Sequence, residues 1–550
     1  MSEASSRILV DRSVLRLDGR PFFAFGPRVL LTPPERYRPV LREIAALGFN
    51  TVVTPPCSPG NLPLIESFFD AAEEEGLLAV LLADPRLPGH GRYLAESFRH
   101  RPGLHSYLLP PRPADGHSLS AFLRERDALR TRDLFHPIHM PLGREHLDGA
   151  WLQSQDLLSV SVSATERRLG GALPRIDPSR AFAASAGNVA ALPRPRYCVD
   201  LPIIARDEER AVGLYSEDPA VACHSPRSID WYPYLANFAN LSRRDFLSPE
   251  PEALRLWVYT LLAQEVRGVF LDFYEGFCGQ LPFTGRDRLA EAAILGAEIR
   301  AFEPFFAEGR PDPAAELDTG HPRLHGTILR HGHEQLVVLS LGGYEDDFFI
   351  DEAWLERTEI TVELEDRDAE LNAWRMDFPH PCKLEVFRDQ GGMLRFHAGP
   401  LELTGLVLLT PGTQRCQRIC DHLRELLPEV ARHATSQLEV RFAKILHTEG
   451  ELRSMGSGVN NMERLRHVQR VLGKSRSALG KEDWGEAYRF GREGCRLARQ
   501  IVKYQMARAL ATPVFENNSL RSVLRMNYFT LPRFYREGAF ESARAFTELT

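Results

Sequence analysis

The chain has 550 residues, of which 43% are hydrophobic and 26% charged, and its formal net charge is −7. These values are typical of a globular protein with several domains, and the small net charge excludes an electrostatic case for nucleic acid or an anionic membrane as partner. The sequence has no signal-peptide pattern, no apolar run near the ~20 residues that span a bilayer, and no CxxC pair among eight cysteines. It therefore predicts a cytoplasmic protein with reduced thiols and no cofactor.

Short apolar runs alternate with amphipathic helical stretches from about residue 22 to 309. The run "LLAVLLADPR" (77–86) is apolar almost throughout, as in a strand buried on both faces. Eight strand candidates lie at 22–26, 50–56, 77–86, 104–109, 137–142, 156–164, 196–205 and 268–277. Because each is followed by a helix or a long connection, they predict an α/β fold, a (β/α)8 TIM barrel. An open doubly wound sheet is the alternative.

The period of the apolar residues changes to two after "GRPDPAAELDTGHP" (309–322), which the Pro and Gly content predicts to be a linker. The alternation predicts an antiparallel β-sandwich, and three later patterns of helical period predict a helical bundle. The tail is expected to pack back on another domain. The predicted domains are a barrel with an N-terminal strand, a sandwich, a bundle and an irregular tail, at 1–312, 313–412, 413–511 and 512–550.

Two segments carry a resemblance to a known family. The stretch 16–56, with "DGRPFFAFG" and "LGFNTVV", resembles the first strand and helix of glycoside hydrolase barrels of the cellulase and β-galactosidase clan. "EALRLWVYTLLAQEVRGVFLDFY" (252–274) and "GAEIRAFEPFFAEGRP" (296–311) look like the last units of such barrels. The order of barrel, sandwich and helical segment is similar to that of uncharacterised bacterial glycosidase-like proteins.

The resemblance implies two catalytic carboxyl groups at the C-terminal strand ends, usually glutamates after the fourth and seventh strands. The fourth strand here is followed by "PPRPADG" (110–116), which contains no glutamate and offers only the shorter Asp115. After the seventh strand, "ARDEERA" offers Asp207 and Glu208 as a nucleophile, although three adjacent charges are also typical of a solvated loop.

Glu275 is the best-placed carboxylate, because it directly follows the apolar eighth strand among aromatic residues. Such surroundings raise a carboxyl pKa, which suits a general acid. We expect Glu275 to face the central cavity within about 8 Å of a second carboxylate. A glutamate paired with an arginine is the alternative. The candidate catalytic residues are therefore Glu275, Asp207 and Glu208.

Candidate substrate-binding residues lie on the same face of the barrel. Asp84 and Arg86 end the third strand and suit sugar hydroxyls, although they could equally form one structural ion pair. Trp231, in a long loop, and Tyr274 offer aromatic rings on which a sugar can stack, and Asp115 completes the set. A long loop that packs its aromatic residues on one another is the alternative for Trp231.

Two further motifs are interpreted as structural. The histidines at 321, 325, 331 and 333 lack zinc-ligand spacing, so no metal site is expected, and Gly332 marks a hairpin turn. The arginines at 489, 492, 496 and 499 are expected to form a solvated helix face rather than a nucleic-acid site.

The sequence thus favours a divergent glycoside hydrolase-like protein that acts on or binds a carbohydrate. A non-catalytic carbohydrate-binding or assembly protein on a degenerate barrel, a pseudoenzyme, is the alternative. The oligomeric state is not predicted.

Overall fold

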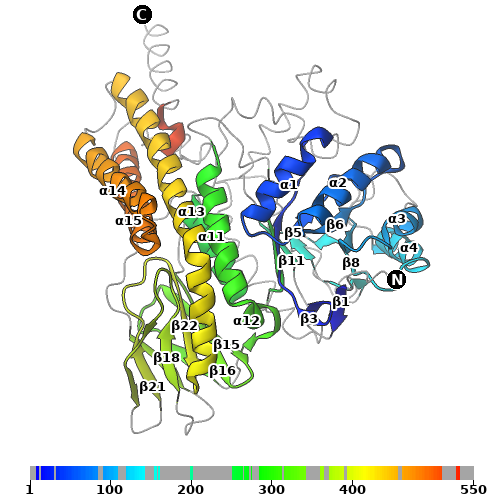
Figure 1. Ribbon diagram of the computed structural model, residues 1–550, viewed down its shortest axis with the longest axis horizontal. Coiled ribbons are helices and arrows are strands. Elements are labelled where there is room, and N and C mark those ends of the chain that lie inside the picture. The colour runs from blue at the N-terminus through cyan, green and yellow to red at the C-terminus, as the bar shows by residue number, and fades with distance from the viewer. Residues whose placement is uncertain are drawn as a thin grey trace, which may run out of the picture.

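The computed structural model places parallel strands with their helices, two antiparallel sheets and a set of long flanking helices (Figure 1). Among the residues that the structure describes, no helix is both long and apolar enough to cross a membrane. The structure describes residues 8–11, 14–29, 32–84, 91–109, 119–142, 154–157, 159–161, 198–201, 250–263, 266–271, 274, 284–311, 315–341, 359–363, 371–388, 393–455, 461–510 and 528–532.

The eight predicted barrel strands are all present and parallel to their neighbours, and the fifth (137–142) is divided into β8 and β9. One sheet has the order β5-β6-β7-β8, and the other has the order β4-β12-β11-β10-β9. The strands are β4 (Ala24–Pro27), β5 (Thr51–Val53), β6 (Leu78–Leu82), β7 (Leu104–Leu108), β8 (Ile138–His139), β9 (Pro141–Leu142), β10 (Ser159–Ser161), β11 (Cys198–Leu201) and β12 (Gly268–Leu271).

The two sheets meet at both sides. Only Met140 separates β8 from β9, and an isolated parallel bridge joins Arg28, after β4, to Val53 on β5. The two sheets are therefore linked into a circuit by the chain at Met140 and by one isolated bridge, whereas an open doubly wound sheet has two free edges. The fold is TIM-barrel-like. The connections 143–153, 162–197 and 202–249 lie outside the described residues, so the complete (β/α)8 pattern stays a prediction there.

Local sequence explains how the circuit starts. The side chain of Asn50 accepts a hydrogen bond from the Phe25 N–H (2.9 Å) and donates one to the Phe23 carbonyl (2.8 Å), which ties β5 to β4. A Cβ on Gly26 would lie 1.5 Å from the Thr51 carbonyl oxygen, so only glycine fits between these strands. The two motifs of the resemblance, "FFAFG" and "LGFNTV", thus contain the residues that join β4 to β5.

Helices cover the barrel strands with the apolar stripes that the sequence predicts. On α1, the side chains of Tyr37, Val40, Leu41 and Ile44 are buried. The helices of this part are α1 (Tyr37–Ala46), α2 (Leu62–Glu74), α3 (Gly91–Phe98), α4 (Leu119–Arg130), α10 (Pro251–Leu262), α11 (Arg286–Ala301) and α12 (Glu303–Glu308), with 3₁₀ turns η1 (Pro34–Arg36) and η2 (Pro59–Asn61). A small antiparallel sheet precedes them, made of β1 (Ile8–Asp11), β2 (Val14–Leu17) and β3 (Arg20–Pro21).

Two antiparallel sheets follow, of six and four strands, in the region predicted as a sandwich. The predicted linker at 309–322 is wrong, because β13 and β14 lie within it and pair with strands of the two sheets. The strands are β13 (Arg310–Pro311), β14 (Glu316–Asp318), β15 (Leu324–His331), β16 (Glu334–Leu341), β17 (Glu359–Glu363), β18 (Asn372–Arg375), β19 (Cys382–Lys383), β20 (Val386–Arg388), β21 (Leu394–His397) and β22 (Thr404–Thr410).

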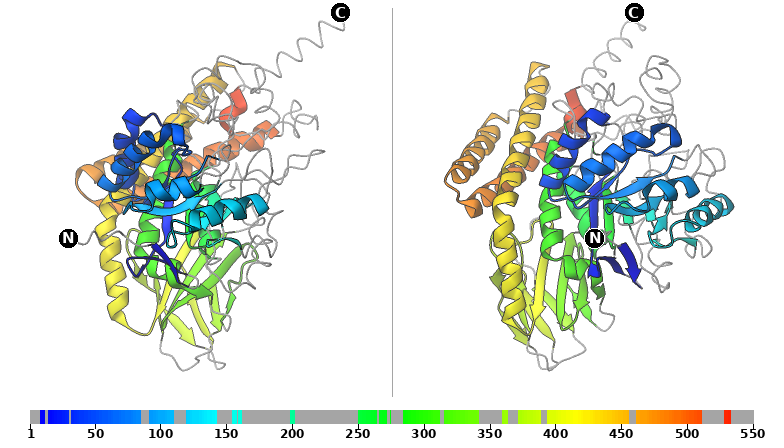
Figure 2. Two further views of the ribbon diagram at one scale, coloured as in Figure 1. Left: turned by 90° about the vertical axis from the view of Figure 1, so that its right-hand side faces the viewer. Right: turned by 45° about the vertical axis from the view of Figure 1, so that its right-hand side comes forward.

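The last helices are α13 (Thr413–Ser454), α14 (Met462–Gly480) and α15 (Trp484–Leu510), with the turn η8 (Tyr528–Thr530). At 1.5 Å per residue, the 42 residues of α13 extend roughly 63 Å along the molecule (Figures 1 and 2). Its first part, up to Ala434, belongs to the core shared by the barrel and the antiparallel sheets. From Leu438 onward it belongs to a second core with α14, α15 and the tail residues Tyr528 and Leu531. The predicted domain limits stay predictions.

Candidate functional site

The C-terminal ends of the barrel strands meet at one edge, where a TIM-barrel active site lies. Of the predicted site residues, Asp84 and Tyr274 are described. The others, together with the proline-rich segment 110–116, lie outside the described residues, so their roles and the distance from Glu275 to a second carboxylate stay predictions. The predicted site residues outside the described ranges are Glu275, Asp207, Glu208, Arg86, Asp115 and Trp231.

Asp84 lies just beyond the end of β6, at this edge. Its residue is 4% exposed, and its backbone N–H donates to the Cys57 carbonyl at 3.0 Å, so the sheet continues past β5 and β6. Burial, and then the charge of Asp84, raise the pKa of the Cys57 thiol to about 12. The carboxylate of Asp84 is therefore held in a largely water-free position beside an inert thiol.

Tyr274 follows β12 at the same edge. Its backbone N–H donates to the Arg28 carbonyl at 2.8 Å, and only 1% of the residue is exposed. The hydroxyl donates to Glu43 on α1, and the other carboxylate oxygen of Glu43 accepts from Arg286 on α11. Because this contact occupies its hydroxyl proton and the residue is buried, the stacking of a sugar on Tyr274 stays a prediction.

A buried polar cluster lies in the fourth strand, and sequence reasoning missed it. Ala79 on β6 pairs with Leu104, whereas Val80 pairs with Ser106, so His105 is the extra residue of a β-bulge. The Ser106 Oγ lies 2.8 Å from Nδ1 of His105 and 3.1 Å from Nε2 of His139 on β8. The only signal was the pair "HS" inside an otherwise apolar run.

The orientation of this cluster follows from its neighbour. Tyr107 donates its hydroxyl to Asp133 at 2.8 Å and sets its ring edge-on to His136, both in the connection between α4 and β8. Because side chains alternate along a strand, Ser106 faces the opposite side, the barrel interior.

The cluster is electrically neutral. Burial lowers the pKa of both His105 and His139 to about 3, and the nearby charge of Arg28 also disfavours protonation of His139. Within the described residues, Nε2 of His105 and Nδ1 of His139 have no hydrogen-bond partner. Among the described residues no carboxylate contacts either imidazole, and all three side chains are buried, so these residues by themselves do not form a nucleophilic triad. It supplies neutral hydrogen-bonding groups beneath the strand ends.

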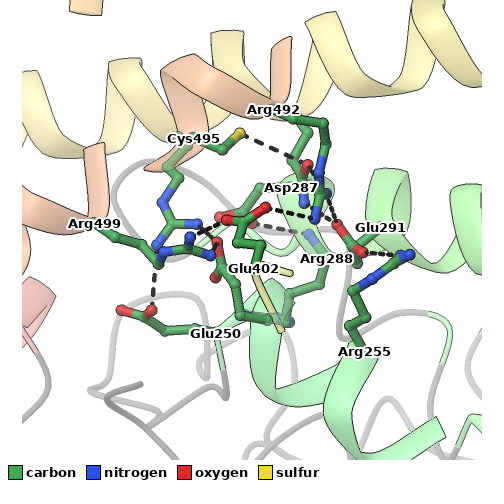
Figure 3. A network of polar contacts seen from close by, with 12 residues as sticks. Glu250, Arg255, Asp287, Arg288, Glu291, Glu402, Arg492, Cys495 and Arg499 are labelled. Atoms are coloured by element: carbon green, nitrogen blue, oxygen red, sulfur yellow. Dashed lines mark hydrogen bonds and ion pairs between the residues drawn. The ribbon is translucent and has the colours of Figure 1, made fainter. Parts of the chain in front are cut away.

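A network of ion pairs lies where α10 and α11 meet α13 and α15 (Figure 3). The expected solvated arginine face is wrong for two of its members. Arg492 donates to Glu291 at 2.6 Å, and Arg499, 3% exposed, donates to Glu252 at 2.9 Å and also to Glu402. These arginines turn inward because buried carboxylates on the barrel helices need positive partners.

The histidine cluster is structural where it is described. His331 bonds Glu308 at 3.1 Å and Arg415 at 2.9 Å, and Gly332 occupies the hairpin turn with φ of +65°. Among the described residues, no group of three or more His, Cys, Asp or Glu side chains is arranged to hold a metal ion.

Comparison with known proteins finds no matching family model and no matching curated sequence. Similar solved structures include a GH30 endoxylanase from Clostridium papyrosolvens, with 8% identity, a TM-score of 0.35, and coverage of 73% of this chain and 98% of that one. An alpha-amylase from Lactobacillus plantarum has 11% identity and a TM-score of 0.37, covering 70% of this chain and 98% of that one. A beta-galactosidase from Marinomonas ef1 has 11% identity and a TM-score of 0.35, covering 51% and 60%.

All three are glycoside hydrolases, the class of protein that the sequence resembles. The TIM-barrel-like arrangement of this chain is shown by its own strand pairings.

Proposed function

We propose that this is a divergent glycoside hydrolase-like protein that acts on or binds a carbohydrate at the C-terminal face of its barrel. The observation that carries the proposal is the meeting of the two resembling segments. β4 comes from the first segment and β12 from the second, and they pair in parallel over four residue pairs, from Gly268–Ala24 to Leu271–Pro27. This pairing supports the proposal, because the first and last strands of a glycosidase barrel also lie side by side in parallel.

The proposed site lies on the strand ends of a complete (β/α)8 barrel. Glu275 follows Tyr274 in the sequence, directly beyond β12, and is proposed as the general acid, with Asp207 or Glu208 as the second carboxylate. The proposed substrate contacts are Asp84, Arg86, Asp115, Trp231 and Tyr274.

The test is hydrolysis of a panel of aryl glycosides and polysaccharides by the purified chain. Glu275→Gln should lower kcat by at least about 100-fold, because general acid catalysis contributes that much. The matched control is Glu463→Gln on the exposed face of α14, which should leave kcat unchanged. Hydrolysis that survives Glu275→Gln would remove this residue from the proposal.

A second candidate function is non-catalytic carbohydrate binding or assembly on a degenerate barrel. It is favoured by the described end of the fourth strand, where residues 104–109 present a neutral His–Ser cluster and no carboxylate. Calorimetric titration with oligosaccharides separates the two candidates. If an oligosaccharide binds without turnover and Asp84→Asn weakens that binding, the second candidate is selected. If the chain shows no binding and no turnover, both candidates are contradicted.

A further inference from the structure

The N-terminal turns of α10 and α11 lie beside the proposed site. α10 leads into β12 and α11 follows it, so both helices begin at the level of the C-terminal strand ends. The bond from Arg286, the first residue of α11, to Glu43 places that turn next to the Tyr274 hydroxyl.

Both turns carry buried carboxylates. Glu250 and Glu252 at the start of α10 are 5% and 2% exposed, and Asp287 at the start of α11 is 1% exposed. A buried carboxylate requires a positive partner, and here the partners come from a distant part of the chain.

Two cations of α13 pair with these carboxylates. Arg441, 2% exposed, donates to Glu252 and, at 3.2 Å, to Glu250. Lys444, 4% exposed, donates to Asp287 at 2.9 Å. Arg499 on α15 also donates to Glu252, so the ends of both barrel helices are held by the flanking helices (Figure 3).

The contact lies between the two hydrophobic cores. Both cations lie in the part of α13 that packs with α14 and α15, whereas α10 and α11 belong to the barrel core. Apolar surfaces are non-directional and tolerate sliding, but a hydrogen-bonded ion pair has one good geometry. The flanking helices therefore meet the barrel ends through contacts that define position.

We propose that Arg441 and Lys444 are positioning residues, which hold the N-terminal turns of α10 and α11 in the arrangement that lets the strand-end face bind carbohydrate. This inference rests on the proposed function, because it assigns the helical segment α13–α15 to the same site.

The protonation of Glu250 gives a diagnostic. Burial raises its pKa to about 7, with Arg441, Arg499 and Lys444 opposing the rise and Glu252 adding to it. The Arg441–Glu250 contact is consequently an ion pair above neutral pH, whereas below it the charged guanidinium donates to an uncharged carboxyl group. Removal of Arg441 should therefore disturb the α10 turn more at pH 8 than at pH 6.

The first readout is hydrogen exchange of the full-length chain, measured for the parent and for Arg441→Met at each pH. Peptides covering 250–256 should exchange at least about tenfold faster in the variant at pH 8, because local opening is set by local contacts. Peptides covering β5 to β7 should be unchanged. Glu250→Gln in the Arg441→Met background should restore the protection of peptides 250–256 from exchange. The matched control is Arg476→Met, which breaks an exposed pair with Glu439.

The second readout is the dissociation constant for the oligosaccharide that the parent binds. Arg441→Met should weaken binding at least about tenfold, since misplacement of a site is costly even when its residues remain. Lys444→Gln, which removes the ion pair with Asp287 and the cation–π contact with Phe529, gives the same tests at peptides 284–290 if Arg441→Met fails to fold.

Three outcomes overturn the positioning role. They are unchanged hydrogen exchange at both turns, exchange that rises evenly over the chain, and local opening of the turns with unchanged affinity for the oligosaccharide. A parent that binds no carbohydrate overturns the proposed function instead, and the exchange data then decide separately whether the two cations hold the turns.

Discussion

Two buried polar clusters of this protein differ in charge, since one consists of neutral side chains and the other of paired charges. In the barrel interior, His105 and His139 are neutral, because burial lowers the pKa of each to about 3. At the helix interface, charges persist. Burial alone would raise the pKa of Glu291, but Arg492 and Arg255 outweigh it and hold that pKa at about 2.

The difference lies in where the partners come from. Each neutral imidazole has one ring nitrogen bonded to Ser106, which comes from the same pair of strands. A buried carboxylate needs a cation, and the partners of Glu291 are 36 and 201 residues away. The neutral imidazoles therefore depend on residues of neighbouring strands, whereas the ion pairs join the flanking helices to the barrel.

The largest effect expected from this comparison is that of Glu291→Gln. The change leaves Arg255 and Arg492 without their shared carboxylate, and breaking a buried ion pair costs about 3–5 kcal/mol. Urea denaturation measures the free energy of unfolding. The matched control is Glu439→Gln, whose exposed pair with Arg476 should contribute less than about 1 kcal/mol. Equal losses in the two variants would erase the distinction between buried and exposed pairs.

A second prediction concerns pH. Both imidazoles have a folded-state pKa below the unfolded value near 6.5, so their contribution is complete above pH 6.5 and is lost as pH falls toward 3. From pH 7 to pH 5 the free energy of unfolding should fall by about 1–2 kcal/mol for each imidazole.

Urea denaturation at pH 7, 6 and 5 measures this slope, and His139→Gln should make it shallower. The same substitution at the exposed His447 should not. A slope that is identical in parent and His139→Gln would mean that His139 is not held neutral by burial.

The smallest effect is expected from Ser106→Ala. Among the described residues the Ser106 hydroxyl is the hydrogen-bond partner that both imidazoles share, and an unsatisfied buried polar group costs about 1–3 kcal/mol. We expect a loss of about 1–2 kcal/mol in urea denaturation. Ser477→Ala, at an exposed position on α14, should stay within about 0.5 kcal/mol of the parent. A loss no larger than that of the control would show that the imidazoles are satisfied in another way.

The repeating elements follow from the sequence alone. Apolar runs placed all eight barrel strands, and helical stripes placed α1, α13, α14 and α15, because burial of one face imposes a period that local sequence displays. The strand-end position of Asp84 was predictable for the same reason. The carboxylates on which catalysis would depend lie outside the described residues and remain sequence predictions.

Only the tertiary structure decided which polar residues are buried. The stretch 309–322 looks like a linker, yet it contains β13 and β14, because strand partners lie far along the chain. Arg492 and Arg499 look solvated on α15, yet they meet Glu291 and Glu252 of the barrel helices. A local period shows which face of a helix is apolar, but whether a charge on the other face meets water or an opposite charge depends on a segment about 200 residues away.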